Sequence, residues 1–203
     1  MRLFLVRHGE TDANRDGIAL GQLDVPLNET GLRQAEAAGR ALAGEPVVAI
    51  YASPLGRAMR TAEAIAAHHP AGVTVDPGLI EMDVGEIDGM PFAQVRELHA
   101  EFLARWLSED GPEHPMPGGE RLVDVAERAW ETLSRLAARH GDETVVAVTH
   151  NFVLLSLLAR VMGVELKNFR RLRHSVGAIS ELEVRPDRAR VLRLNDTCHL
   201  GGE

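Results

Sequence analysis

The chain has 203 residues, of which 45% are apolar and 26% are charged, and its formal net charge is −8 at pH 7. This length suits one domain with a substantial core, and we expect a single domain over residues 1–203. The acidic balance argues against a broad electrostatic surface for nucleic acid or for an anionic membrane. An anionic ligand would therefore be held by a few cations inside a cleft.

Cysteine content and hydropathy bear on the compartment. The single cysteine, Cys198, excludes an intrachain disulfide, as is typical of proteins from a reducing compartment. Residues 3–6 form an apolar run that is far shorter than the hydrophobic region of a secretory signal. The longest apolar stretch, 152–164, is interrupted by a serine and an arginine and is too short to span a bilayer. These features predict a soluble, cytoplasmic protein without a membrane partner.

The first half of the chain alternates strand and helix patterns. The apolar run at 3–6 is typical of a strand that is covered on both faces, and a loop rich in Gly, Asp and Asn follows to about Asn28. Thr30 then has the character of a helix N-cap, and Gly44 ends that helix. The next predicted elements are a buried strand, a helix and a short strand, at 47–52, 53–67 and 73–75.

The second half continues the alternation after a long helical region. Helical periodicity returns at 92–107 and 121–139, and the segment between them, 110–119, is too rich in Pro and Gly for regular structure. The remaining predicted elements are a central strand, a buried helix and two closing strands around a turn at Pro186-Asp187, with the bounds 144–149, 152–164, 178–184 and 189–194.

This alternation predicts an α/β protein with a largely parallel sheet between helices. In such sheets ligands gather at the carboxyl ends of the strands. Three predicted strands end in polar groups, which are Arg7-His8, Ser53 leading to Arg57, and His150. We therefore expect one site at this edge of the sheet, with the 110–119 loop lying over it.

The polar groups at this edge suit phosphoryl transfer. A neutral imidazole such as that of His8 attacks phosphorus well and leaves a phosphohistidine that water can cleave. Arg7 and Arg57 each offer a planar fork for two phosphate oxygens. His150, as a cation or an N–H donor, and the amide of Asn14 offer further contacts. Two guanidiniums can hold a phosphate dianion without a metal, and the sequence has no HExxH, paired cysteines or tight His/carboxylate triplet.

The segment Leu5-Val6-Arg7-His8-Gly9-Glu10-Thr11 resembles the signature of the histidine phosphatase superfamily, the phosphoglycerate mutase-like proteins. Further matches follow in order along the whole chain: Asn14, Pro26-Leu27-Asn28-Glu29-Thr30-Gly31, Ser53-Pro54-Leu55 with Arg57, Glu81, Pro117-Gly118-Gly119-Glu120, Val148-Thr149-His150 and Leu194-Asn195-Asp196-Thr197-Cys198-His199-Leu200. The resemblance implies a three-layer α/β/α sandwich with a six-stranded, mostly parallel mixed sheet.

The resemblance also implies roles for the matching residues. His8 becomes phosphorylated, and Glu81 protonates the leaving oxygen and then acts as base for the hydrolytic water. Neither a metal nor another cofactor is implied. The candidate catalytic residues are His8, Glu81, Arg7, Arg57 and His150, and the candidate substrate-binding residues are Arg7, Asn14, Arg57, His150, Gln22 and Asn151.

Some assignments stay open. Asp83 and Glu86 are alternatives to Glu81, because all three lie in one acidic segment. The family usually has Gly where this chain has Asn151, so a side chain stands beside the phosphate pocket. The basic cluster Lys167, Arg170, Arg171 and Arg173 is read as a solvated helix face or turn, or as a contact for a second anionic group of the substrate. The segments of His174 and His199 could approach the site.

We expect a phosphoric monoester hydrolase that acts on a small phosphorylated metabolite. The phosphoglycerate mutases carry an Arg-His-Tyr-Gly element after the acid, whereas Glu81 is followed here by a compact acidic run and the only tyrosine is Tyr51. The alternatives are a cofactor-dependent phosphoglycerate mutase and a catalytically idle binding or regulatory protein on the same fold. The loops at 16–25 and 82–119 are expected to select the leaving group, and a homodimer is left open.

Overall fold

The computed structural model describes residues 1–185 and 188–201, so the turn predicted at Pro186-Asp187 lies outside the described residues. The strands are β1 (Arg2–Arg7), β2 (Val47–Ala52), β3 (Val73–Val75), β4 (Thr144–Thr149), β5 (Ile179–Val184) and β6 (Ala189–Asp196). The α-helices are α1 (Asp12–Arg15), α2 (Glu29–Leu42), α3 (Gly56–Ala66), α4 (Phe92–Leu98), α5 (Ala100–Trp106), α6 (Leu122–His140) and α7 (Asn151–Val161). Short 3₁₀ helices span Pro77–Leu79, Gly85–Ile87, Gly111–Glu113, Leu166–Arg171 and Cys198–Leu200.

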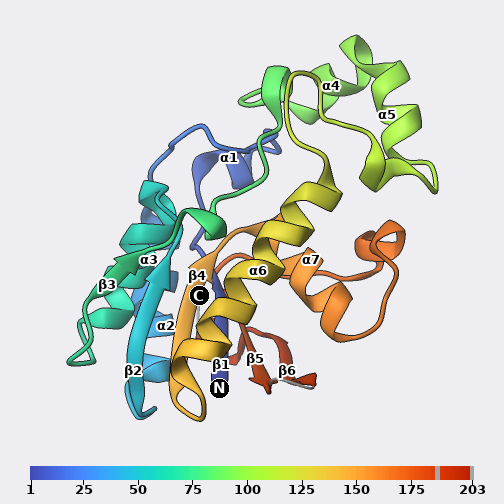
Figure 1. The fold of residues 1–203 in the computed structure, drawn as a ribbon. Helices are drawn as coiled ribbons and strands as arrows, with labels where there is room; N and C mark the ends of the chain where they lie inside the picture. The colour runs from blue at the N-terminus through green and yellow to red at the C-terminus, as the bar shows by residue number, and fades with distance from the viewer. Residues whose placement is uncertain (186–187, 202–203) are drawn as a thin grey trace.

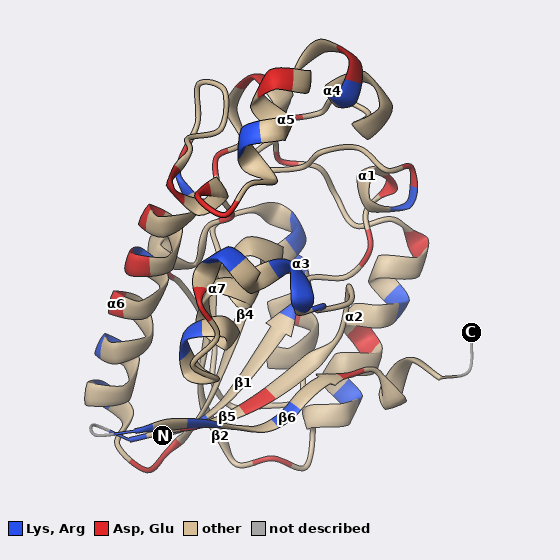
Figure 2. Cartoon of the chain, turned by 90° about the vertical axis from the view of Figure 1, so that its right-hand side faces the viewer, with Lys and Arg blue, Asp and Glu red and all other residues tan. Residues whose placement is uncertain are grey.

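The strands form one six-stranded sheet in the order β3-β2-β4-β1-β5-β6. The pairs among β1, β2, β3 and β4 are parallel, and β5 is antiparallel to both β1 and β6. The predicted α/β fold with a mostly parallel mixed sheet is thereby confirmed. Helices α2 and α6 lie on opposite sides of the sheet, and α4 and α5 stand beyond one end of it (Figures 1 and 2).

Alternate residues of the central strands supply the two halves of the core. In β1, Leu3 and Leu5 belong to one buried cluster, with α6 and α7, whereas Phe4 and Val6 belong to the other, with α2 and α3. This two-sided burial is the physical reason why the strands read as continuous apolar runs. Within the described part of the chain, no helix is long and apolar enough to cross a membrane.

Local signals placed some boundaries wrongly. Asn28, rather than Thr30, is the N-cap of α2, because its side chain accepts a hydrogen bond from the backbone N–H of Gly31 at 2.8 Å. The loop predicted to run to Asn28 contains α1, which Thr11 and Asn14 close with a reciprocal capping box.

The region between α3 and α6 departs most from prediction. The helix predicted at 92–107 is two helices, because His99 leaves the helical conformation with φ −122° and ψ 35°. Val95 and Trp106, on successive helices, belong to the same buried cluster. The Pro/Gly-rich loop also contains the short 3₁₀ helix Gly111–Glu113. We call residues 82–119 the cap segment.

Candidate active site

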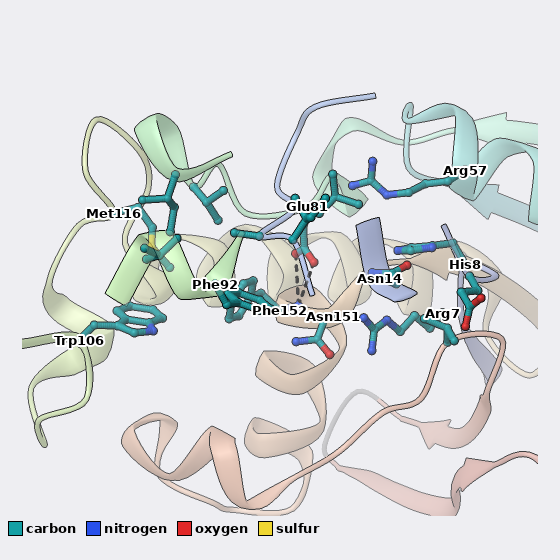
Figure 3. Close-up of a pocket in the computed structure, with 18 of the residues that line it drawn as sticks. Arg7, His8, Asn14, Arg57, Glu81, Phe92, Trp106, Met116, Asn151 and Phe152 are labelled. Carbon is teal, nitrogen blue, oxygen red and sulfur yellow. Dashed lines mark hydrogen bonds between the residues drawn. The ribbon is translucent and has the colours of Figure 1, made fainter. Parts of the chain in front are cut away.

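A cavity of about 450 Å³ lies where the carboxyl ends of the central strands meet the cap segment. Arg7 and His8 from the end of β1 and Arg57 from the start of α3 lie at one end of it, whereas Trp106 and Met116 lie at the opposite end (Figure 3). Its polar lining residues are Arg7, His8, Glu10, Asn14, Arg57, Glu81, Asn151, Arg173 and Ser175. The cap segment contributes Val84, Ile87, Phe92, Val95, Phe102, Leu103, Trp106 and Met116.

His8 follows β1 directly and is 3% exposed. Its Nδ1 lies 2.7 Å from the carbonyl oxygen of Gly9. Because a carbonyl can only accept, Nδ1 carries the proton, and the lone pair of Nε2 is left for attack on a substrate. Burial and the nearby charges of Arg7 and Arg57 hold the pKa of His8 well below its usual range. The imidazole is therefore neutral, as a nucleophile requires.

The turn after His8 depends on a close contact between the backbones of Gly9 and Gly31. A Cβ on Gly9 would stand 2.3 Å from the carbonyl oxygen of Gly31, at the start of α2. No side chain fits in that distance, so the backbone after β1 can press against α2 only because Gly9 has none. This contact fixes the position of the Gly9 carbonyl, to which Nδ1 of His8 is hydrogen-bonded.

Two guanidiniums flank His8 and are anchored by backbone carbonyls. Arg57, in the first turn of α3, is 1% exposed and donates to the carbonyls of Leu23 at 2.8 Å and Gly21 at 2.6 Å. Arg7 donates to the carbonyl of His174. Burial lowers the pKa of Arg7 to about 10 and also lowers that of Arg57, so both remain cationic at neutral pH. The contacts leave the Nε–H of each guanidinium without a partner.

His150 follows β4 directly, as the N-cap of α7, and is fully buried, with its ring centroid 5.0 Å from that of His8. Its Nε2 lies 2.6 Å from the hydroxyl oxygen of Ser53, and its Nδ1 has no partner. Burial and then the neighbouring His8 and Arg57 hold its pKa well below the usual range. Of the two forms considered from the sequence, the structure therefore favours the neutral one.

Unpartnered polar atoms gather in these residues. In the described part of the chain, the buried side-chain polar atoms without a hydrogen bond are Nε of Arg7, Nε of Arg57, Nδ1 of His150, and ring nitrogens of His69 and His174. Buried polar groups are nearly always paired in native proteins. The three that belong to predicted site residues therefore indicate a ligand that accepts hydrogen bonds. Donors that are cationic or flanked by cations favour an anion.

The three amide residues proposed from the sequence have different positions. Asn14 lines the cavity, and its Oδ1 accepts from the N–H of Thr11 at 3.1 Å, which leaves its amide nitrogen available. Asn151, the first residue of α7, also lines the cavity and lies between Arg7 and Phe152 (Figure 3). Gln22 instead donates to the carbonyl of Glu81 at 3.0 Å and is not among the lining residues.

Of the three candidate acids, Glu81, Asp83 and Glu86, only Glu81 lines the cavity. It is 3% exposed, and both carboxylate oxygens lie 3.2 Å from the backbone nitrogen of Phe152, at the start of α7 (Figure 3). Burial raises its pKa, although the N–H groups of Met82 and Phe152 and the charge of Arg7 oppose the rise. A raised pKa keeps a carboxyl protonated and able to act as a general acid.

The alternative acids occupy other positions. Asp83 accepts from the backbone N–H of Gly85 at 2.8 Å, and neither Asp83 nor Glu86 lines the cavity. Among the described residues, no group of three or more His, Cys, Asp or Glu side chains is arranged to hold a metal ion.

Arg128 is a residue that the sequence reasoning missed. From the middle of α6 it donates to the carbonyls of Gly78 at 3.1 Å, Ile80 at 2.7 Å and Glu81 at 3.1 Å. It also pairs with Glu120 at 3.1 Å. Arg128 and Gln22 therefore fix the backbone that carries the Glu81 carboxyl. The available signal was an arginine beside the buried stripe of a predicted helix, three residues after Val125.

The members of the basic cluster at 167–173 have different surroundings. Lys167 pairs with Glu109 and Glu165, and Arg170 stacks on the rings of Trp106 and Phe169. Arg173 lines the cavity. Of the two histidine segments singled out, that of His174 supplies the carbonyl that holds Arg7, and His199 bonds the carbonyl of Gly177 at 2.9 Å.

Comparisons with known proteins agree with this geometry. Residues 3–197 match the family model "Histidine phosphatase superfamily (branch 1)". The chain is 34% identical to Phosphoserine phosphatase 1 of Hydrogenobacter thermophilus, over 99% of this chain and 95% of that protein. It is 32% identical to the probable phosphoglycerate mutase GpmB of Proteus mirabilis, over 90% of this chain and 85% of that protein. The solved structure of Bacillus stearothermophilus YhfR superimposes with a TM-score of 0.91 at 30% identity, over 98% of both chains. This chain therefore belongs to branch 1 of the histidine phosphatase superfamily.

Proposed function

We propose that the protein hydrolyses small phosphate monoesters through a phosphohistidine on His8, without a metal ion. Phosphatase action on small monoesters follows from family membership. The covalent route and the roles of individual residues are our proposal. The observation that carries it is a set of buried, unpartnered polar atoms, the Nε–H donors of Arg7 and Arg57 and Nδ1 of His150, around a neutral imidazole whose Nε2 is free.

In the first step, Nε2 of His8 attacks phosphorus, and the bond from phosphorus to the ester oxygen breaks. The proton of Glu81 goes to the departing oxygen, so the alcohol leaves neutral. In the second step, water attacks the phosphohistidine and gives its proton to Glu81. The P–N bond breaks, its electron pair returns to Nε2, and phosphate departs. Both residues are then restored for the next turnover.

The guanidiniums would act on the charge of the transferring group. Each charge-assisted hydrogen bond contributes about 1.5–3 kcal/mol net. These contacts accelerate the reaction only to the extent that they are stronger in the transition state than in the bound substrate. Arg7 and Arg57 are anchored by carbonyls before any ligand binds, so little reorganisation is needed.

Trapping the intermediate tests the proposal directly. The enzyme is mixed with a ³²P-labelled monoester and denatured in alkali, where phosphohistidine persists, and the labelled peptide is identified. We expect the label on His8 and full phosphate release in the presence of EDTA. A label on another residue, or activity that EDTA removes and Mg²⁺ restores, would contradict the proposal. If neither label nor phosphate forms with a broad panel of esters, the idle binding protein becomes the better reading.

A mutase is the second candidate, because a relative carries that name. One feature supports hydrolysis over the mutase reaction, namely the position of the tyrosine, because the mutases carry a tyrosine in the element after the acid. The only tyrosine, Tyr51, is in β2 with its hydroxyl 2.9 Å from His140, and it does not line the cavity. Incubation with 3-phosphoglycerate and a trace of 2,3-bisphosphoglycerate separates the two candidates. We expect inorganic phosphate, whereas efficient isomerisation with little phosphate would favour the mutase.

A further inference from the structure

The cavity has two chemically different ends. We call the end around His8, Arg7 and Arg57 the phosphate end and the end lined by the cap segment the cap end. The cavity's polar lining side chains come from the end of β1 and the α1 region after it, from Arg57 in α3, from Glu81, from the start of α7 and from the 173–175 segment. Every residue that the cap segment contributes is apolar, and Met116 and Trp106 lie farthest from His8 in Figure 3. A phosphoryl group on His8 would therefore place the leaving group against the cap segment.

The apolar end offers little to a polar leaving group. Val95 is 2% exposed and Met116 and Val84 are each 3% exposed. None of the buried polar atoms that lack a partner in the described chain belongs to the cap segment. A hydroxyl or carboxylate that entered this end would lose its hydration and would find only one hydrogen-bond donor among the cap-segment side chains that line the cavity, the indole N–H of Trp106. A hydrocarbon group would gain from leaving water.

Trp106, which forms part of the cap end of the cavity, is also held in place before a ligand binds. The Trp106 ring stacks on that of Phe102 at 6.1 Å and meets that of Phe152 edge-on at 6.3 Å. Arg170 lies 5.1 Å over the same indole and donates to the Trp106 carbonyl at 2.6 Å. A preformed surface of this kind adds little ordering cost to binding.

Arg173 is the feature that argues for a different leaving group. It is exposed, lines the cavity, and has no ion pair or hydrogen bond with any residue that the structure describes. Its charge lowers the pKa of Arg7, so it lies within electrostatic reach of that guanidinium. A carboxylate next to the phosphate, as in phosphoserine, could meet it, and this makes phosphoserine the natural competitor in a test.

We propose that the ester's leaving group is apolar, an alkyl chain or aromatic ring that fills the cap end of the cavity. This inference rests on the proposed function. It names the substrate class and goes beyond the reaction itself.

A series of n-alkyl phosphates from ethyl to hexyl tests it, because their alcohols leave with nearly equal intrinsic ease. Each added methylene buried against the cap segment should raise kcat/KM about fourfold, so hexyl phosphate should exceed ethyl phosphate on the order of 100-fold. Hexyl phosphate should also exceed phosphoserine. A flat series, with phosphoserine the better substrate, would overturn the inference and assign the specificity to Arg173.

Two variants of α4 localise the effect. Phe92 lines the cavity and is 53% exposed, whereas Leu98, at the other end of α4, is 61% exposed and does not line it. Phe92→Ser should lower the hexyl-to-ethyl ratio of kcat/KM about fivefold, and Leu98→Ser should leave that ratio unchanged. Equal effects of the two variants would overturn the inference, because the preference would then not arise from the cavity wall.

The two proposals fail differently. If esters are hydrolysed and His8 is labelled, but chain length has no effect, only the inference about the leaving group is wrong. If no ester in the series releases phosphate and no label reaches His8, the proposed function is wrong, and the inference falls with it.

Discussion

The two ends of the cavity are built on different physical terms. The phosphate end consists of buried cations and ring nitrogens that are fixed by backbone carbonyls and lack part of their hydrogen bonding. The cap end consists of apolar side chains, most of which are buried against one another, whereas Phe92 is 53% exposed. The phosphate end has unpaired hydrogen-bonding groups that favour an anionic ligand, whereas the cap end has mainly an apolar surface on which a ligand can pack. The comparison suggests that the reaction resides at the strand ends and that substrate choice resides in the cap segment.

The largest effect is expected for His8→Ala. Without the nucleophile, turnover should fall at least about 10⁴-fold for every ester, whatever the length of its leaving group. The melting temperature should change little, and alkaline denaturation after mixing with labelled ester should reveal no phosphoenzyme. His68→Ala, at an exposed position outside the cavity, is the matched control. A phosphoenzyme that persists in His8→Ala would break the assignment of chemistry to the strand ends.

Arg57→Lys comes next, with an expected loss of kcat/KM of about 100- to 1,000-fold, because an ammonium lacks the planar fork. The carbonyls of Gly21 and Leu23 would lose donors, so the free energy of unfolding should fall by about 1–3 kcal/mol. Arg60→Lys is the control one turn away on α3, where the side chain is exposed and pairs with Glu63. If both variants kept wild-type kinetics, the buried guanidinium would have only a structural role.

Glu81→Gln should lower kcat about 100-fold for ethyl phosphate and far less for p-nitrophenyl phosphate, whose leaving group needs little protonation. The pH profile sharpens the test. Because the pKa of His8 is lowered, the imidazole becomes protonated and stops acting as a nucleophile only at acidic pH. Because the pKa of Glu81 is raised, the carboxyl stays protonated until the pH rises through its own pKa, and only then stops acting as an acid. We expect a bell centred on mildly acidic to neutral pH, and Glu81→Gln should lack its alkaline limb. A variant that kept this limb would assign it to another group.

The smallest effect is expected for Arg128→Met, which acts on Glu81 through the backbone. We expect a roughly tenfold loss of kcat with ethyl phosphate and a smaller loss with p-nitrophenyl phosphate, as for Glu81→Gln but weaker. Arg128→Lys should recover part of the loss. Arg121→Met, at an exposed ion pair with Asp124 beside the same helix, is the control. Equal losses with both esters would indicate general destabilisation instead of positioning.

Much of the phosphate end was predictable because its signals are local. β1 and β4 are buried on both faces, so they appear as apolar runs, and the polar residue after each run is placed at the sheet edge by strand geometry alone. His8 and His150 were placed at this edge in this way and Arg57 through the segment that follows β2, and the structure brings the three together. The start of α2 was placed wrongly, because Asn28 and Thr30 both carry side chains that can cap a helix and it is Asn28 that accepts the N–H of Gly31.

The cap segment could not be read in the same manner. Its apolar residues are separated by Gly, Pro and charged positions, and the break at His99 has no strong local signal. Arg128 is likewise an ordinary helix arginine until the carbonyls of 78–81 are folded against it. The functional meaning of these residues depends on partners that are distant in the sequence.

The sequence by itself determined the alternation of strands and helices, the family and the identity of the groups at the strand ends, since each follows from residues adjacent in the chain. Only the tertiary structure decided which of three acids enters the cavity, what holds that acid, and that the opposite wall is apolar. These properties arise from burial and desolvation, which depend on what surrounds a side chain on all sides.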